Sequence, residues 1–443
     1  MRLGVGAGFV GDRFEPAVEL VRHAKLDALV FECLAERTIA LAQVDMLSGQ
    51  GDGFDRRILT RIAQTLPFAR ENGTVLITNA GAANPNRAGL AIQDEARRLG
   101  LDCRIAVVTG DDVLGSLDLM QSEILGEHGA TLDRYAGRIV SANAYLGAAG
   151  VVEALAQGAD IVVTGRVADA ALFLAPLIHE FGWQTTDWDL LAQGSVVGHL
   201  LECAGQLTGG YFADGDRKVV PGMARIGFPY ADIGPTGNAT FSKVSGSGGR
   251  LDRLTCLEQL FYEVSDPGAY LTPDVVVDMT AVEISEDLLK GSVSVIGARG
   301  RSRPETLKVS VGIQDGYQGI AEISYSGPGS RRRGLMAIDV IKERWLEVHG
   351  RDELELECTL VGINSCWPWV EVDAPDPAEV RARFAIRTLN REPAVTLVHE
   401  VEALYTNGPA GGGGVTTRIN EALGIVSTLI PREAVQPRME IIT

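Results

Sequence analysis

The chain has few positive charges, no closely spaced cysteine pair and no apolar run long enough to span a membrane. Lys and Arg number 40 against 58 Asp and Glu, and the net charge of −18 disfavours nucleic-acid backbones and anionic membranes as partners. The six scattered cysteines include no C-x-x-C motif, which argues against a zinc ribbon, an iron–sulfur site or a disulfide framework. The N-terminal stretch reaches Asp12 and Arg13 before a signal-peptide core could form, so we expect a cytoplasmic protein.

The composition is that of an ordinary globular protein, with 46% apolar and 22% charged residues. A chain of 443 residues suits two domains or one large one, and it needs no disulfide or metal to complete its core. The 52 glycines cluster beside apolar runs, which indicates many turns between strands and loops. No internal repeat is visible.

Short apolar runs alternate with amphipathic segments over the first part of the chain. The apolar runs are Arg2–Val5, Leu26–Phe31, Thr74–Ile77, Cys103–Val108, Arg138–Ser141 and Asp160–Val163. The helix-like segments are Glu15–His23, Asp55–Asn72, Gly89–Leu99 and Tyr145–Gln157. This alternation predicts an α/β fold, a doubly wound and mainly parallel sheet with helices on its faces.

The pattern changes after about residue 182. Glycines and prolines interrupt the periodicity there, which predicts long loops with one short helix near Ser195–Cys203. From Pro273 onward, alternating strand-like runs and the amphipathic segment Arg331–His349 predict a second, α+β domain. We therefore expect an α/β domain over 1–265, with its loop-rich extension, and an α+β domain over 266–443.

Polar residues follow nearly every predicted strand of the first domain. The carboxyl ends of strands in an open α/β sheet are where ligands bind, so these residues predict a cleft. The candidates for binding or catalysis are Gly8, Gly11, Asp12, Arg13, Glu36, Arg37, Asn79, Asp111, Asn143, Arg166 and Asp169.

Three of these candidates have a more specific expected role. Asp12 and Glu36 would face one cleft, where two carboxyl groups can separate their pKa values into an acid and a base. The structural alternative is that Asp12 caps the first helix and Glu36 bonds Arg37 or a helix N-terminus. Arg166 would anchor a substrate carboxylate or phosphate, or else form an ion pair with Asp169.

The loop-rich segment adds a second set of candidates. His199 and Glu202 can share a helical turn and are candidate proton carriers. His199 and Cys203 have a metal-ligand spacing, but no third ligand with matching spacing follows, and a divalent metal held by carboxylates stays open. The other binding candidates are Cys203, Gly209, Gly210 and Lys243, the last of which is equally well explained as a solvated charge.

Two glycine-rich motifs leave alternatives open. GAGFVG, with Glu32 about twenty residues further on, has the outline of a dinucleotide-binding motif. Asp12 and Glu15 at the following helix start are unfavourable for a pyrophosphate. The glycine run at 408–414 precedes a predicted helix, where it would form an anion site or a flexible connector.

Motifs spread over nearly the whole chain resemble the acyclic terpene utilization family, called AtuA-like. They are GAGFVGDR, LDALVFECLAERT, TNAGAANP, ANAYLGAAG, GADIVVTGRVADAAL, HEFGW, GHLLECAGQLTGGYFAD and DPGAYLTPDVVVD. The resemblance implies a setting in terpene and branched-acid breakdown, beside acyl-CoA carboxylases, CoA transferases and hydratases. Some relatives carry an additional C-terminal ferredoxin-like domain, which we expect this sequence to lack. The resemblance therefore implies that a separate small partner subunit could replace this domain.

These observations predict an enzyme of small organic acid or acyl-CoA catabolism, a hydratase or lyase that uses acid–base residues at the sheet's carboxyl edge. One alternative is a nucleotide-dependent oxidoreductase, based on GAGFVG and Glu32. Another is a non-catalytic subunit that binds a partner enzyme. We also expect a homo-oligomer. The sequence assigns no cofactor.

Overall fold

A computed structural model describes residues 1–367 and 376–442 and shows a mixed α/β protein, as the sequence predicts. The chain divides into two compact units. The first contains residues 1–312 and 425–443, and the second contains residues 313–424. The position near residue 265, where the sequence predicts a boundary, lies within the first unit, and the strand-rich region that follows it contributes to both units.

The centre of the first unit is a parallel array of five strands in the order β1-β2-β3-β6-β4. They are β1 (Arg2–Ala7), β2 (Ala28–Phe31), β3 (Val75–Thr78), β6 (Ile161–Thr164) and β4 (Ile105–Thr109). All residues of β2 and β6 are buried, which explains their continuous apolar runs.

Helices form two layers on this array. The first layer contains α1 (Glu15–His23), α3 (Arg57–Asn72) and α4 (Pro85–Arg98), and the second contains α5 (Ala149–Ala156), α6 (Asp169–Phe181) and α7 (Trp188–Glu202). The chain passes from β3 to β4 and then returns to β6, so the winding direction reverses between these strands. Right-handed crossovers then place the two helix layers on opposite faces, which is the predicted doubly wound arrangement.

Antiparallel strands extend both edges of this array into a ten-stranded sheet. They are β7 (Pro229–Ile233), β8 (Ala239–Lys243), β12 (Ser292–Ile296) and β11 (Glu283–Asp287) beyond β1, and β18 (Arg438–Ile442) beside β4. The segment predicted as loops thus supplies a strand pair and also α8 (Arg253–Leu260). The helix predicted near Ser195 begins at Trp188, and it is buried continuously from Leu191 to Leu201, so no amphipathic period shows its extent.

One predicted strand of the parallel array lies elsewhere. The run at Arg138–Ser141 becomes β5 (Ile139–Ala144), which pairs with β14 (Thr306–Ser326) and not with the parallel strands. A short three-stranded sheet completes the first unit, with β9 (Tyr270–Leu271), β10 (Val276–Asp278) and β13 (Arg299–Arg301). Helix α2 (Glu36–Leu47) follows β2.

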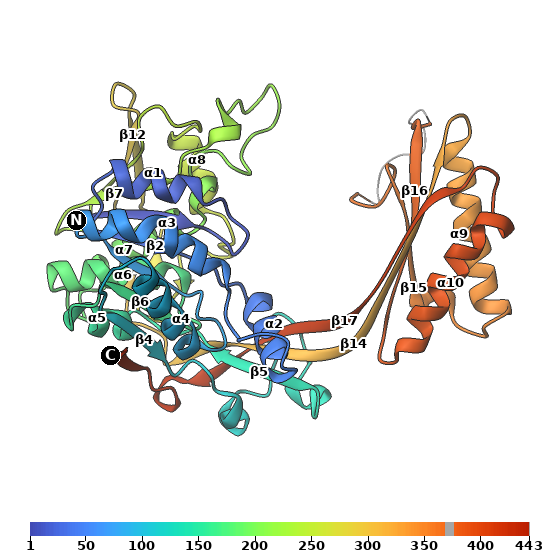
Figure 1. Ribbon diagram of the computed structural model, residues 1–443, viewed down its shortest axis with the longest axis horizontal. Helices are drawn as coiled ribbons and strands as arrows, with labels where there is room; N and C mark the ends of the chain where they lie inside the picture. Colours follow the sequence, from blue (N-terminus) through green and yellow to red (C-terminus); the bar gives the residue numbers. More distant parts are fainter. Residues whose placement is uncertain (368–375, 443) are drawn as a thin grey trace. The chain divides into compact units, whose positions relative to one another are not determined.

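The second unit has the connectivity β-α-β-β-α-β. The elements are β14, α9 (Ser330–Glu347), β15 (Leu356–Val361), β16 (Glu379–Thr388), α10 (Arg391–Asn407) and β17 (Gly413–Pro431). The sheet order β15-β16-β14-β17 is that of a ferredoxin-like fold, and α9 and α10 lie together on one side of β15 and β16 (Figure 1). The core includes Tyr325, Trp345 and Phe384. The glycine run at 408–414 precedes β17 and not the predicted helix, so the expected helix N-terminus is wrong.

A buried carboxylate in the second unit makes its stability depend on pH. Glu400 on α10 accepts hydrogen bonds from Arg344 at 2.6 and 2.9 Å, and it lies 2.8 Å from Nε2 of His349. The hydrogen bonds from Arg344 are the main cause of a pKa of about 2 for Glu400, although burial opposes the shift. The carboxylate is therefore ionised wherever the unit is folded above that pH.

We expect Glu400→Gln to destabilise the second unit by about 1 kcal/mol at neutral pH, a modest value because Arg344 is half exposed. Because the folded-state pKa is depressed, this stabilisation is present above the ordinary pKa of 4.5 and is lost as the pH falls towards 2. Amide hydrogen exchange in α9 and α10 at neutral and acidic pH measures the difference, with exposed Glu402→Gln as the control. Equal protection in both variants at neutral pH would contradict this expectation.

Candidate active site

A pocket of about 920 Å³ lies in the first unit. Its walls come from the segments that follow β1, β2 and β6, from the end of α7, and from residues 205–211, 262–273 and 304–308. The pocket therefore occupies the carboxyl edge of the parallel strands, where the sequence predicts a cleft. The residues directly after β3 and β4 do not line it, although Leu125, further along the segment after β4, does.

The last turn of α7 brings a histidine and a carboxylate together at the pocket wall. Nδ1 of His199 lies 2.8 Å from Oε1 of Glu202, and their side chains are 2% and 12% exposed. Burial alone would lower the pKa of His199, but the adjacent Glu202 carboxylate raises it above its ordinary value. The second oxygen of Glu202, Oε2, is buried without a hydrogen-bond partner among the described residues. The Tyr270 ring packs 5.3 Å from the His199 ring.

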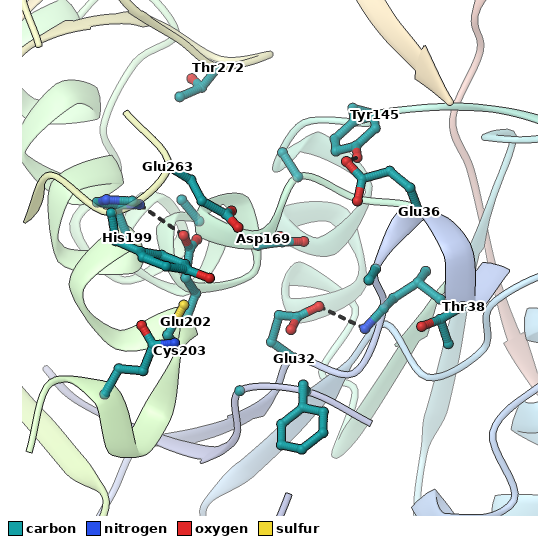
Figure 2. A pocket seen from close by; sticks show the side chains of 18 of the residues that line it. Glu32, Glu36, Thr38, Tyr145, Asp169, His199, Glu202, Cys203, Glu263 and Thr272 are labelled. Carbon is teal, nitrogen blue, oxygen red and sulfur yellow. Dashed lines mark hydrogen bonds and ion pairs between the residues drawn. The ribbon is translucent and has the colours of Figure 1, made fainter. Parts of the chain in front are cut away.

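Two further carboxyl groups lie close to this pair. Figure 2 shows Glu202, Asp169 and Glu32 around the same hollow, with His199 on the far side of Glu202. Burial raises the pKa of Asp169 and of Glu32, and the neighbouring carboxylates raise both further, against the opposing charge of Arg166. The two carboxyl groups share the single guanidinium of Arg166 with their neighbours, so ionising both Asp169 and Glu32 is unfavourable.

The guanidinium of Arg166 lies behind this cluster and does not line the pocket. It donates to the carbonyl oxygens of Leu34 and Val167 and to the Asp169 carboxylate, and its centre lies 4.5 Å above the Tyr145 ring. With a side chain only 1% exposed, Arg166 has the geometry of the structural alternative, an ion pair with Asp169. The substrate-anchor role predicted for it has no support in these contacts.

Three other predicted binding residues also lie behind the pocket wall. Asn79 donates to Glu32 Oε1 at 2.9 Å and accepts from the Cys33 amide at 2.7 Å, so it orients the Glu32 carboxyl. Asp111 accepts from the Arg166 amide at 2.9 Å and from Asn143 at 3.0 Å. Burial raises the pKa of Asp111 to about 6. These buried residues support the wall and do not contact the cavity.

Asp12 and Glu36 line the same pocket, as predicted, with pKa values displaced in opposite directions. Burial raises the pKa of Asp12, which accepts hydrogen bonds from the amides of Gly8 and Arg13 at 2.9 and 2.8 Å. Burial also opposes ionisation of Glu36, but hydrogen bonds from Tyr145 at 2.5 Å and Lys308 at 3.2 Å lower its pKa to about 2. The first structural alternative does not hold, because Asp12 bonds its own loop and no side chain caps α1. The second holds in part, because Glu36 is the first residue of α2 and its carboxylate also accepts a hydrogen bond from its own backbone amide.

The glycine-rich loop after β1 is packed tightly against the end of α7. A Cβ atom added to Gly8 would lie 2.5 Å from the carbonyl carbon of Cys203. Buried Arg61 of α3 donates to the carbonyl oxygens of Asp12 and Arg13 at 2.9 and 3.1 Å and so fixes the other side of the loop. The Gly8 amide is occupied by the Asp12 carboxylate and is not available to a dinucleotide pyrophosphate.

The remaining predicted binding residues divide between the pocket and other places. Arg13, Cys203 and Gly210 line the pocket, and burial raises the pKa of the Cys203 thiol. Gly209 has a φ of 101° and precedes the lining residue Gly210. The residues outside the lining are Gly11, Arg37 and Lys243, and Lys243 donates to the Ser247 carbonyl at 2.8 Å.

Three non-glycine residues at or beside this pocket have positive φ angles. Tyr211 and Glu263 line it with φ angles of 61° and 59°, and Ala204, with a φ of 45°, lies between two lining residues. Non-glycine residues rarely adopt positive φ, and such strain persists where the surrounding structure enforces it, often at functional sites. This observation supports a functional role for the pocket independently of its charges.

Several lining residues were not among the predicted candidates. They are Glu32, Tyr145, Glu263, Tyr270 and Lys308. Glu32 follows β2 directly, and this position at a strand end could have identified it as a pocket residue. The sequence pattern instead placed Glu32 in a dinucleotide-binding motif. Tyr270 and Lys308 come from short or distant strands, and nothing in the local sequence connects them to the pocket.

Within residues 1–367 and 376–442, no group of three or more His, Cys, Asp or Glu side chains has an arrangement that could hold a metal ion. Among the helices in the same part of the chain, none is long and apolar enough to cross a membrane.

Comparison with known proteins identifies the family. The family model described as "Acyclic terpene utilisation family protein AtuA" matches residues 1–441. The chain therefore belongs to this family, in agreement with the resemblance seen in the sequence. No curated protein and no solved structure matches the chain.

Proposed function

We propose that this member of the acyclic terpene utilisation family is a hydratase or lyase acting on a small organic acid or acyl-CoA in this pocket. The observation that supports it is the Glu202–His199 pair, whose second carboxylate oxygen has no hydrogen-bond partner among the described residues and lies beside Asp169 and Glu32, two carboxyl groups with raised pKa values. A largely apolar wall strengthens the electrostatic effect of such groups.

The proposed reaction is the removal of water from, or its addition to, the carbon–carbon bond beside an acyl group. The Glu202 carboxylate takes the proton from the carbon next to the carbonyl. The electron pair forms the double bond, and the hydroxyl on the next carbon leaves as water with a proton from Asp169 or Glu32. Hydration is the reverse. The proposal assigns the base role to Glu202 and the acid role to Asp169 or Glu32, because the pKa values of these two carboxyl groups are raised.

His199 has a supporting role in this proposal. Its ring contacts Glu202 on the side away from Asp169, so it orients the carboxylate. The Glu202 carboxylate raises the pKa of His199 and so favours the protonated ring. Glu36 and Asp12 would contact the substrate nearer the glycine-rich loop.

Exchange of substrate protons with heavy water tests the proton-transfer step by itself, so the natural substrate need not be identified first. Pure protein is incubated in D₂O with a panel of acyl thioesters and hydroxy acids, and deuterium uptake is followed by mass spectrometry. We expect uptake beside the carbonyl of at least one compound, much slower in Glu202→Gln and unchanged in Glu153→Gln, an exposed position on α5. Ligand-dependent reduction of a nicotinamide or flavin would favour the oxidoreductase alternative. No response to any compound would favour a non-catalytic subunit.

A further inference from the structure

The ionisable residues that line the pocket are mostly acidic. The carboxyl groups are Asp12, Glu32, Glu36, Asp169, Glu202 and Glu263. Among the described residues, the lining cations are only Arg13, Lys308 and, when protonated, His199. The balance of charge in the wall is therefore negative.

The two permanent cations of the lining, Arg13 and Lys308, already contact oxygen acceptors. Lys308 lies 3.2 Å from Glu36, and its side chain is 43% exposed. Arg13 is exposed and donates to the carbonyl oxygens of Met223 and Ala224 at 3.2 and 3.3 Å. Both positive charges thus lie at well-solvated positions, where an anion gains little.

The more buried positive groups are already matched with carboxylates. His199 is paired with Glu202, and Arg166, behind the wall, is paired with Asp169 and with backbone carbonyls. Glu32, only 7% exposed, adds a third carboxyl group at the same place. A free carboxylate entering here would leave water and find no unmatched cation.

We infer that the pocket accepts an acyl group in an uncharged form, as a thioester, ester or amide, and rejects the same acyl group as a free carboxylate. This inference rests on the proposed function, because it takes this pocket as the substrate site. It narrows the substrate from "organic acid or acyl-CoA" to the activated acyl form.

Reaction chemistry favours the same form. Removing the proton beside a thioester carbonyl gives an enolate with one negative charge, whereas removing it beside a carboxylate gives a species with two. A wall that already holds excess negative charge would stabilise the first far better than the second.

Matched ligands test the inference by isothermal titration at neutral pH. The probes are but-2-enoyl and oct-2-enoyl groups, each as the free acid, the primary amide and the N-acetylcysteamine thioester. For at least one of the two acyl groups, we expect the amide and the thioester to bind at least about ten times more tightly than the free acid. In Asp169→Asn the Arg166 charge loses its carboxylate partner, so the acid should gain affinity relative to the amide, whereas Glu153→Gln should leave the ratio unchanged.

The outcomes separate this inference from the proposed function. Acid binding equal to or tighter than amide binding would overturn the charge selection and leave the pocket as the substrate site. Absence of binding by all six probes would overturn both. An unchanged acid-to-amide ratio in Asp169→Asn, with the fold intact by circular dichroism, would show that the carboxyl cluster does not set the selection.

Discussion

Glu202→Gln is expected to slow deuterium exchange beside the substrate carbonyl by about a hundredfold or more, because an amide cannot accept the proton. The substitution keeps the size of the side chain and removes its negative charge. In the wild type, Oε2 of Glu202 has no hydrogen-bond partner among the described residues. Ligand affinity and thermal stability should therefore change far less than the rate. Single-turnover exchange together with titration of an amide ligand separates the rate from the affinity.

His199→Gln gives the matched comparison for this pair. Gln can keep a hydrogen bond to Glu202 but cannot carry the positive charge, so we expect a loss of about tenfold and an altered pH profile. In the wild type the rate should fall as the pH rises through the raised pKa of His199, and the variant should lack this decline. A Glu202→Gln variant with near wild-type exchange would exclude Glu202 as the base. A His199→Gln loss well under tenfold, with an unchanged pH profile, would remove His199 from the mechanism.

Much of the parallel sheet could be predicted because its signals are local. The apolar runs before Gly6, Glu32, Asn79 and Arg166 are buried strands, and the helix predicted at Glu15–His23 has those bounds in the structure. The rule that ligands bind at the carboxyl edge then identified a cleft. The five residues predicted as catalytic all line one pocket, although their roles stay predictions. They are Asp12, Glu36, Asp169, His199 and Glu202.

The parts that were missed depend on pairings between distant segments. β5 has the apolar pattern of its neighbours, yet its partner is β14, more than a hundred residues later in the chain. The same pairing region brings Lys308 to Glu36 and Tyr145, and no local period encodes that contact. Similarly, the second unit is ferredoxin-like because of the spatial order of the strands in its sheet, and a sequence pattern does not determine that order.

The role of Arg166 shows why a position at a strand end does not by itself identify a ligand contact. The sequence alone assigns this arginine either to the substrate or to Asp169, and in the structure the side chain is 1% exposed with the carboxylate and two backbone carbonyls as its acceptors. Burial alone would lower its pKa, but the nearby carboxylates raise it, so it stays charged. Its positive charge compensates a cluster that would otherwise be strongly destabilised.

Arg166→Lys is expected to destabilise the first unit by about 3 kcal/mol, because a lysine cannot replace the several hydrogen bonds that the buried guanidinium donates. A lysine ammonium has one nitrogen and cannot reach Leu34, Val167 and Asp169 together, so buried acceptors lose their partners. Hydrogen exchange should rise in β6 and α6 and stay unchanged in α9 and α10, which belong to the second unit.

Arg70→Lys is the matched control for this substitution. Arg70 also pairs with an aspartate, Asp160, but its side chain is 40% exposed, so we expect a loss below about 1 kcal/mol. A substrate anchor would behave differently from a structural pair: ligand affinity would fall sharply in Arg166→Lys while the exchange of β6 and α6 stayed as in the wild type. That result would restore the anchor role and would require Arg166 to leave its present partners when substrate binds. The opposite result would identify Arg166 as the counter-charge of the carboxyl cluster. In that result, β6 and α6 lose protection from hydrogen exchange, whereas the folded variant still binds the primary-amide ligand with wild-type affinity.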